Sequence, residues 1–486
     1  MASTLPDPHP DAHRTAAGGI ATSSPASLAP ERTGGIESHG IDHIPDSERR
    51  GRPRELFPVW AAANVNYLSL VVGGALVLMG LSLGQAVAVI VVGNAFWLLT
   101  GLLAVSGPAA GAPSEVVTRA MYGIRGNRVN NAVTGWMISV CYFALNLAAA
   151  ATAAFSLVAR TGLPVNNAVK ALVVVLIAAV TLAISVYGHA AIIRLYVPIT
   201  LVLTAVFAVL AFAVVRHTDF GYVPDRPLTG SALWATALAG VGLIASGPLS
   251  YTTSADFSRY LPRSTSARSV AGWTAFGGFL PGTLVCCLGA FAATAVDMSD
   301  PQGALEGLLP GWFRPVFLLA LVLGTVALNA LTAYSAGLAL QAVGIRIRRS
   351  LSVLVDGAVS VSLTLYALLV SDFLETVGNV LQLTVVLLGP SMAVYATDIL
   401  LRRNRYDGLA LADETPGSPF WYTGGVNWPG ALALAAGVAA SAACVDTVYT
   451  GPVAAALGGI DLALPVGLSV ASGVYAVSMR ALRAKG

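Results

Sequence analysis

Polar side chains recur at helical spacing inside segments that are otherwise apolar. Tyr142 and Asn146 are four residues apart and Ser139 lies one turn earlier, so all three would share one helix face. Asn329 and Thr332, three residues apart, form a second such pair. Each set alone is more typical of a helix–helix hydrogen bond. Together these amides, hydroxyls and aromatic rings predict a cavity for a small, flat, uncharged solute.

Two other segments combine polar side chains with breaks in the backbone. The stretch Asn64 to Ser69 precedes Gly73-Gly74. The stretch Ser246 to Ser254 contains a Gly-Pro pair, Gly247-Pro248, followed by hydroxyl-bearing residues. Pro248 removes a backbone donor and clashes with the preceding turn. Within a bilayer the freed carbonyls must face protein or a watery cavity. An ordinary proline kink would explain one break, whereas two corresponding breaks predict the midplane site of an inverted-repeat transporter.

The chain that positions these groups is too apolar for a soluble fold. It is 56% hydrophobic and only 10% charged, against roughly 25% charged in soluble domains. A membrane-crossing helix needs about 20 mostly apolar residues. This rule predicts an all-α polytopic membrane protein with twelve spans, at 58–80, 84–106, 131–159, 168–187, 190–215, 231–254, 271–295, 315–343, 351–370, 373–400, 427–445 and 462–482.

The distribution of Lys and Arg predicts the orientation of these spans. With the N-terminus in the cytoplasm, twenty of the 27 basic residues lie on the cytoplasmic side, five lie outside and two lie far out in the tail. Cytoplasmic loops of membrane proteins carry an excess of Lys and Arg. We therefore expect a multi-pass protein of the cell membrane (plasma or inner membrane) with both termini in the cytoplasm.

This topology divides the chain into four parts. Residues 1–54 lack apolar periodicity and are expected to form a disordered cytoplasmic tail. Residues 55–220 would form a first five-helix repeat, and 221–405 a second repeat of inverted topology, because five crossings reverse the chain. Residues 406–486 would supply a connecting loop, helices 11 and 12 and the C-terminus.

Residue types that would support an enzyme are scarce at membrane depth. The four cysteines lie in apolar runs without zinc-like spacing, and the six histidines lie in the tail or in predicted loops. Catalysis would need paired titratable groups at depth. The spans with polar clusters carry no charge near their middle, which disfavours a charged solute. We expect no enzymatic activity, no metal, no cofactor and no nucleic-acid partner; the oligomeric state stays open.

Several ordered segments resemble purine–cytosine permeases of the nucleobase–cation symporter family. The resemblance runs from about residue 36 to about residue 405. It is carried by Gly40 to Phe57 with Trp60 to Asn64, by Gly111 to Asn127, by Ser254-Ala-Asp-Phe-Ser-Arg-Tyr-Leu-Pro262, and by Asn329-Ala-Leu-Thr-Ala-Tyr-Ser-Ala-Gly337.

The resemblance implies a LeuT-type fold, a 5+5 inverted repeat with helices 1 and 6 broken, that imports nucleobases with H⁺ or Na⁺. It also implies that helices 3, 6 and 8 hold the heterocycle. Together with the helix 1 break, it gives these candidate substrate-binding residues: Asn64, Ser69, Tyr142, Phe143, Asn146, Ser246, Gly247, Ser250, Tyr251, Asn329 and Asn379.

Departures from the family pattern bear on the coupling ion. Relatives often carry tryptophan in helices 3 and 6, where this chain has Tyr142 and Tyr251. Sodium-dependent relatives have paired hydroxyl residues on helix 8, where this chain has Ala327 and Leu328, with Thr325 the nearest hydroxyl. We favour proton coupling. The alternatives are sodium-coupled uptake, or a LeuT-type carrier of allantoin, hydantoin or an amino acid.

Overall fold

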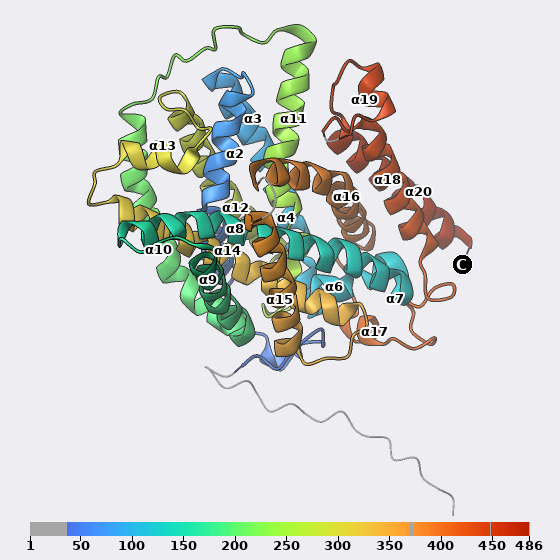
Figure 1. The fold of residues 1–486 in the computed structure, drawn as a ribbon. Helices are drawn as coiled ribbons and strands as arrows, with labels where there is room; N and C mark the ends of the chain where they lie inside the picture. Colours follow the sequence, from blue (N-terminus) through green and yellow to red (C-terminus); the bar gives the residue numbers. More distant parts are fainter. Residues whose placement is uncertain (1–35, 370–372, 448, 486) are drawn as a thin grey trace, which may run out of the picture.

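The computed structural model describes residues 36–369, 373–447 and 449–485, and within them every regular element is helical (Figure 1). The first five predicted spans correspond to α1 (Leu56–Asn64) with α2 (Tyr67–Leu78), to α3 (Leu83–Asn94) with α4 (Trp97–Ala104) and α5 (Ser106–Ala110), to α8 (Ile138–Arg160), to α9 (Asn167–Tyr187) and to α10 (His189–Val215). The links include α6 (Ser114–Val117), α7 (Arg119–Asn130) and a π-helical stretch, Asn131–Met137.

The remaining spans also have helical counterparts, numbered here as they were predicted. They are α11 (Gly230–Leu249), α12 (Ala267–Ala293), α14 (Arg314–Ala342), α15 (Arg349–Leu369), α16 (Phe373–Arg402), α18 (Trp428–Cys444) and α20 (Ala463–Lys485), linked by α13 (Pro301–Leu308), α17 (Gly408–Ala412) and α19 (Pro452–Ala456). Among the described residues nine helices are long and apolar enough to cross a membrane, and the bent pair in span 1 gives a tenth. The chain is a multi-pass membrane protein.

The packing of the spans follows the pattern of an inverted repeat. Span 1 packs on span 7 through α2 and α12, and span 6 packs on span 2 through α11 and α3. Likewise α9 of span 4 contacts α14 of span 8, and α15 of span 9 contacts α8 of span 3. When each span is replaced by the span five positions away, the contact of spans 1 and 7 becomes that of spans 6 and 2. In the same way the contact of spans 4 and 8 becomes that of spans 9 and 3. This exchange is what two five-helix repeats of opposite topology produce.

The two predicted helix breaks are both present. The two halves of span 1 meet at an angle of 62° around Val65 and Asn66. Regular helix in span 6 ends at Leu249, and a 3₁₀ turn, Ser254–Phe257, follows four residues later. The Gly247-Pro248 pair therefore lies in the last turn of α11 rather than in mid-helix.

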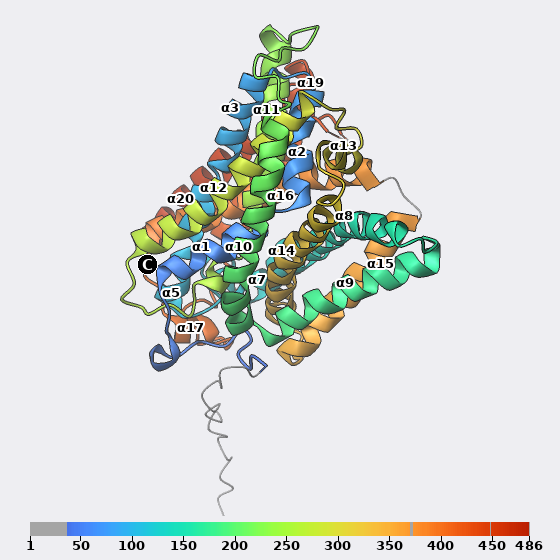
Figure 2. The same cartoon turned by 90° about the vertical axis from the view of Figure 1, so that its left-hand side faces the viewer.

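Residues 36–54, which we name the N-terminal strap, are packed on the helices and correct this part of the predicted disordered tail; residues 1–35 of that tail lie outside the described residues. Glu37 is 3% exposed and Ile44 is fully buried. The Ile44 N–H donates to the Gly111 carbonyl at 2.8 Å. The strap lies at the same end of the molecule as α17, opposite α13 and α19, and we call that end the strap face (Figure 2). Hydrogen bonds and ion pairs hold the strap, which explains why apolar periodicity gives no sign of it.

Candidate functional site

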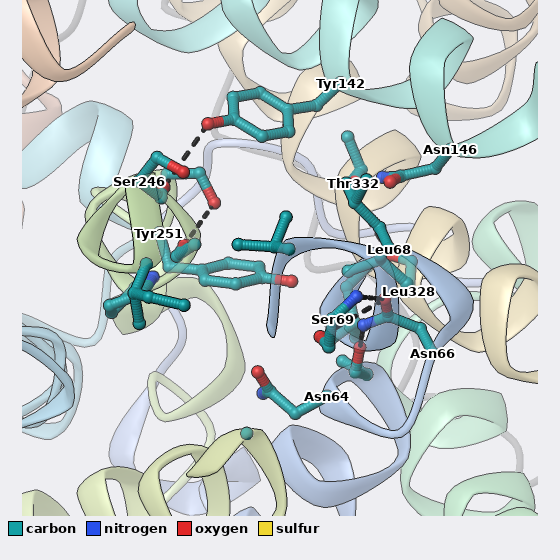
Figure 3. Close-up of a pocket in the computed structure, with 18 of the residues that line it drawn as sticks. Asn64, Asn66, Leu68, Ser69, Tyr142, Asn146, Ser246, Tyr251, Leu328 and Thr332 are labelled. Carbon is teal, nitrogen blue, oxygen red and sulfur yellow. Dashed lines mark hydrogen bonds between the residues drawn. The ribbon is translucent and has the colours of Figure 1, made fainter. Parts of the chain in front are cut away.

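A cavity of about 100 Å³ lies where the two helix breaks approach each other. Spans 1, 2, 3, 6, 7 and 8 all contribute to its lining (Figure 3). Asparagine, serine, threonine and tyrosine side chains alternate with aliphatic ones, and none of the lining residues carries a charge. A mostly apolar pocket with a few placed polar groups is the usual chemistry of a small-molecule site.

Asn66 stabilises the break in span 1 from both sides. Its side-chain Nδ2 donates to the Ala63 carbonyl at 2.7 Å, which satisfies the end of α1. Its Oδ1 accepts from the Ser69 N–H at 3.0 Å, which caps the start of α2. Asn64 donates to the Trp60 carbonyl at 2.8 Å. The break is thus fixed by the chain's own side chains, and Asn64 and Ser69 are held at the wall of the cavity.

The break in span 6 is supported by neighbouring spans. Thr100 of α4 donates its hydroxyl to the Pro248 carbonyl at 2.9 Å, and its own carbonyl accepts from the Ser254 hydroxyl at 2.9 Å. Tyr142 of α8 donates to the Ser246 carbonyl at 3.3 Å and hydrogen-bonds the Thr384 hydroxyl of α16 at 3.0 Å. Freed backbone groups at membrane depth need such partners. The Tyr142 hydroxyl also joins spans 3, 6 and 10 beside the cavity.

Tyr251 provides an aromatic surface inside the pocket. In Figure 3 its ring extends from the span 6 break toward the middle of the lining side chains. Behind it, Trp60 packs edge-on with ring centroids 4.8 Å apart, and Trp97 lies tilted at 5.4 Å. Aromatic packing of this kind fixes ring orientation. A flat solute would therefore meet a rigid tyrosine face, although the tryptophans themselves are not part of the lining.

Two predicted residues occupy different positions from those expected. Phe143 is fully buried in the hydrophobic cluster between spans 3, 4, 8 and 9, because it lies on the side of α8 away from the cavity. Asn329 does not line the cavity: its Nδ2 donates to the Phe143 carbonyl at 2.9 Å, and its Oδ1 accepts from Asn146 at 3.1 Å. Asn329 orients Asn146, and Asn146 faces the pocket (Figure 3).

The cavity brings eight of the eleven candidate residues together: Asn64, Ser69, Tyr142, Asn146, Ser246, Gly247, Ser250 and Tyr251. Asn379 lies outside the residues whose side chains the structure describes. Six further polar residues line the cavity: Asn66, Asn94, Ser139, Thr253, Thr332 and Ser335. Four of them belong to the polar stretches and helix faces noted in the sequence, whereas Asn94 and Ser335 were missed. An isolated asparagine in an apolar span was the available signal for Asn94, and helical spacing from Thr332 was the signal for Ser335.

The fold matches solved transporters along almost the whole chain. The structure of Mhp1, a nucleobase-cation-symport-1 family transporter, closed with bromovinylhydantoin bound, gives a TM-score of 0.75 at 18% identity, covering 91% of this chain and 94% of that one. The inward-facing conformation of Mhp1 gives 0.70 at 18% identity, with 93% and 96% covered. A Na⁺-coupled sialic acid symporter gives 0.58 at 11% identity, with 89% and 90% covered.

Sequence comparison points to the same group. YxlA of Bacillus subtilis (strain 168), a provisionally named purine-cytosine permease, is 26% identical over 456 residues, which cover 92% of this chain and 96% of that protein. A family profile described as permeases for cytosine/purines, uracil, thiamine and allantoin matches residues 43–467. Helix breaks, pocket and profile agree, and the chain belongs to this family of permeases.

Proposed function

We propose that this permease imports a neutral nucleobase or a closely related heterocycle by proton symport. The observation that carries the proposal is the uncharged polar cavity between the two helix breaks. Its amides and hydroxyls match the hydrogen-bonding edge of a nucleobase, and Tyr251 offers a face on which the ring stacks. A solute that lacks an amide edge would leave buried amides unpaired, at a cost of about 1–3 kcal/mol per group.

The size of the cavity favours a single ring. A protein cavity of about 150 Å³ holds a benzene molecule. At about 100 Å³, this cavity fits a pyrimidine such as cytosine more readily than a bicyclic purine. We place the ring against Tyr251, with its amide edge toward Asn146 and Asn64.

The surroundings of Thr325 support a proton rather than sodium as the coupling ion. A hard cation takes several oxygen ligands. The Thr325 hydroxyl donates to the Leu321 carbonyl at 3.1 Å, one turn back in its own helix. The Ala327 carbonyl accepts from the Tyr196 hydroxyl at 2.5 Å. Ala327 and Leu328 carry no side-chain oxygen, and the Ala327 carbonyl is already hydrogen-bonded, so this helix offers fewer sodium ligands than the paired hydroxyls of relatives would.

We assign the strap face to the cytoplasm, since the excess of Arg and Lys in the loops follows the positive-inside pattern. The solute would enter from the opposite face of the plasma or inner membrane. The two repeats would then rock about the central site and open the strap face. Coupling follows when solute and proton together favour a different conformation from either alone.

Uptake of radiolabelled cytosine by a transporter-deficient strain expressing the chain tests the proposal. We expect saturable uptake that rises as external pH falls and is indifferent to a sodium gradient. Unlabelled uracil, adenine, hypoxanthine, allantoin and hydantoin rank the substrates by competition. Competition by an amino acid alone, or uptake that requires sodium, would contradict the proposal.

A further inference from the structure

A buried carboxyl group lies on the strap side of the solute cavity and is linked to its wall. Ser335, a lining residue of α14, donates its hydroxyl to Asp256 Oδ2 at 2.7 Å. Asp256 belongs to the 3₁₀ turn that follows the break in span 6, and it is fully buried. Its Oδ1 accepts from the Ser114 N–H at 2.8 Å. One hydroxyl group therefore separates this carboxyl from the cavity.

A second carboxyl group, that of Glu115, lies against Asp256. Glu115 is 1% exposed, and it directly follows Ser114, whose N–H holds the Asp256 carboxyl, so the two carboxyl groups are buried neighbours. The Ala255 N–H donates to the Ser114 hydroxyl at 3.1 Å, which holds the two segments together. Apart from its own backbone N–H, no donor among the described residues reaches the carboxyl oxygens of Glu115. Two neighbouring buried carboxyl groups are not both ionised at such a place, because like charges repel strongly where water is excluded.

The charges around this pair balance only when it holds one proton. Glu37 of the strap lies 3.1 Å from Arg259 and 3.4 Å from Arg349, both of them buried. Arg349 pairs with Glu37, and Arg259 faces both Glu37 and the pair. The two positive charges are balanced by the negative charge of Glu37 and by one negative charge on the pair, so one shared proton makes the cluster neutral. The other titratable side chains around the cluster are counted as neutral, and they are His189, Tyr260, Tyr334 and Tyr395. Burial of an uncompensated charge is unfavourable.

We propose that Glu115 and Asp256 form a carboxyl pair that binds the transported proton, on the strap side of the solute cavity and sealed from the strap face by the N-terminal strap. This assignment rests on the proposed proton symport and names the residues that perform it. Arg259 completes the seal, since it donates to the Gly40 carbonyl of the strap at 2.6 Å.

The Ser335 hydroxyl gives the proton a route from the cavity. A hydronium ion, delivered through water that enters with the solute, gives its extra proton to the Ser335 oxygen and is left as neutral water; the serine's own O–H proton passes to the Asp256 carboxylate. Release breaks one carboxyl O–H bond, leaves the electron pair on the carboxylate, and transfers the proton to water once the strap face has opened. The resulting carboxylate is stable only in contact with water, which joins proton release to opening of that face.

Burial, and then the Asp256 charge, raise the pKa of Glu115 well above its ordinary value of 4.5. When the pH is below the ordinary pKa, a carboxyl group whose pKa is raised by burial favours the conformation that buries it. The preference is lost as the pH rises through the raised pKa. Higher pH on the strap face therefore favours the open conformation, as proton release to an alkaline cytoplasm requires.

Two measurements on the full chain test the pair. In proteoliposomes, Glu115→Gln, which mimics the protonated state, should exchange cytosine within about twofold of the unsubstituted protein. It should no longer accumulate cytosine in response to a pH gradient. Cytosine should also no longer acidify the vesicle interior, as reported by an internal pH-sensitive dye. Infrared difference spectra need no solute: the carbonyl stretch of a protonated carboxyl at neutral pH should be lost in Glu115→Gln. Asp256→Asn provides a second variant for both measurements.

The matched control is Glu414→Gln. Glu414 is also on the strap face, but it pairs with Arg119 and Arg128 away from the pair. It should retain both signals. Unchanged proton uptake in Glu115→Gln and Asp256→Asn would overturn the assignment. Asp356 is another buried carboxyl group without a donor among the described residues. Loss of coupling in Asp356→Asn instead would also overturn the assignment. If cytosine transport itself is absent, the proposed function fails, and the infrared band still decides whether the pair holds a proton.

Discussion

The N-terminal strap leads to a quantitative prediction for Glu37→Gln. Glu37 accepts from Tyr260 at 2.5 Å, from Tyr334 at 2.9 Å and from the His189 N–H at 2.8 Å, in addition to its two arginine partners. Although burial by itself would raise the pKa of Glu37, Arg349 and Arg259 lower it to about 2. The carboxylate therefore stays ionised, and its stabilisation is present above pH 4.5 and lost only as the pH falls toward 2.

The expected size of the effect follows from these contacts. Removing one partner of a buried ion pair costs about 3–5 kcal/mol. Glutamine keeps one acceptor oxygen for the two tyrosines and the backbone N–H, so we take the lower value. A loss of about 3 kcal/mol from the closed conformation shifts the balance toward opening of the strap face by about 150-fold.

Alkylation of Cys286 measures this shift. Cys286 lines the solute cavity, and the other three cysteines can be replaced by serine. A membrane-impermeant thiol reagent, applied to inside-out vesicles, should modify Cys286 far faster in Glu37→Gln than in the unsubstituted protein.

Glu48→Gln is the matched control. Glu48 is on the same strap and pairs with His39, but its side chain is 27% exposed. The hydrogen bond of its side chain to His39 is worth about 1 kcal/mol, so the effect of Glu48→Gln should stay below about fivefold. Equal alkylation rates in the two variants would refute the view that Glu37 holds the strap face closed.

Two further predictions concern the cavity, and a third concerns the packing of span 7 on span 1. Tyr142→Phe removes a hydrogen bond worth about 1 kcal/mol and should raise KM for uptake about fivefold, because the hydroxyl joins spans 3, 6 and 10; an unchanged KM would show that this bridge does not shape the site. Asn146→Ala should abolish cytosine binding in a stable protein, whereas Asn329→Ala should both weaken binding and lower thermal stability; ligand titration and melting in detergent separate the two. Gly289→Ala should prevent correct folding, since its Cβ would overlap the Leu70 carbonyl; normal yield in the membrane would contradict this.

Much of the fold could be predicted because membrane crossing depends on segment length and composition. The breaks were also readable, since Asn66 and Pro248 belong to residue types that interrupt helices. The direction in which a side chain points was harder to predict. The helix α8 is surrounded by protein on most of its length, so Tyr142 and Phe143 look alike in sequence although only one reaches the cavity.

The strap shows a different limit of sequence reasoning. Glu37 is buried by partners that come from four distant segments, at His189, Arg259, Tyr334 and Arg349. Local composition predicts disorder there, because it contains too little apolar surface to fold by itself. Contacts that form only after the helices have assembled leave no periodic pattern in the chain.

The way Asn66 caps both half-helices has a consequence for how such permeases diversify. Since one side chain satisfies the backbone on each side of the break, the geometry of the cavity does not depend on a bound solute. Substitutions at lining positions that make no hydrogen bond to Asn66, such as Ser139 or Thr332, leave that framework intact. New solute preferences are therefore accessible by single amino-acid changes, each selected for its contacts alone, on a scaffold that tolerates them.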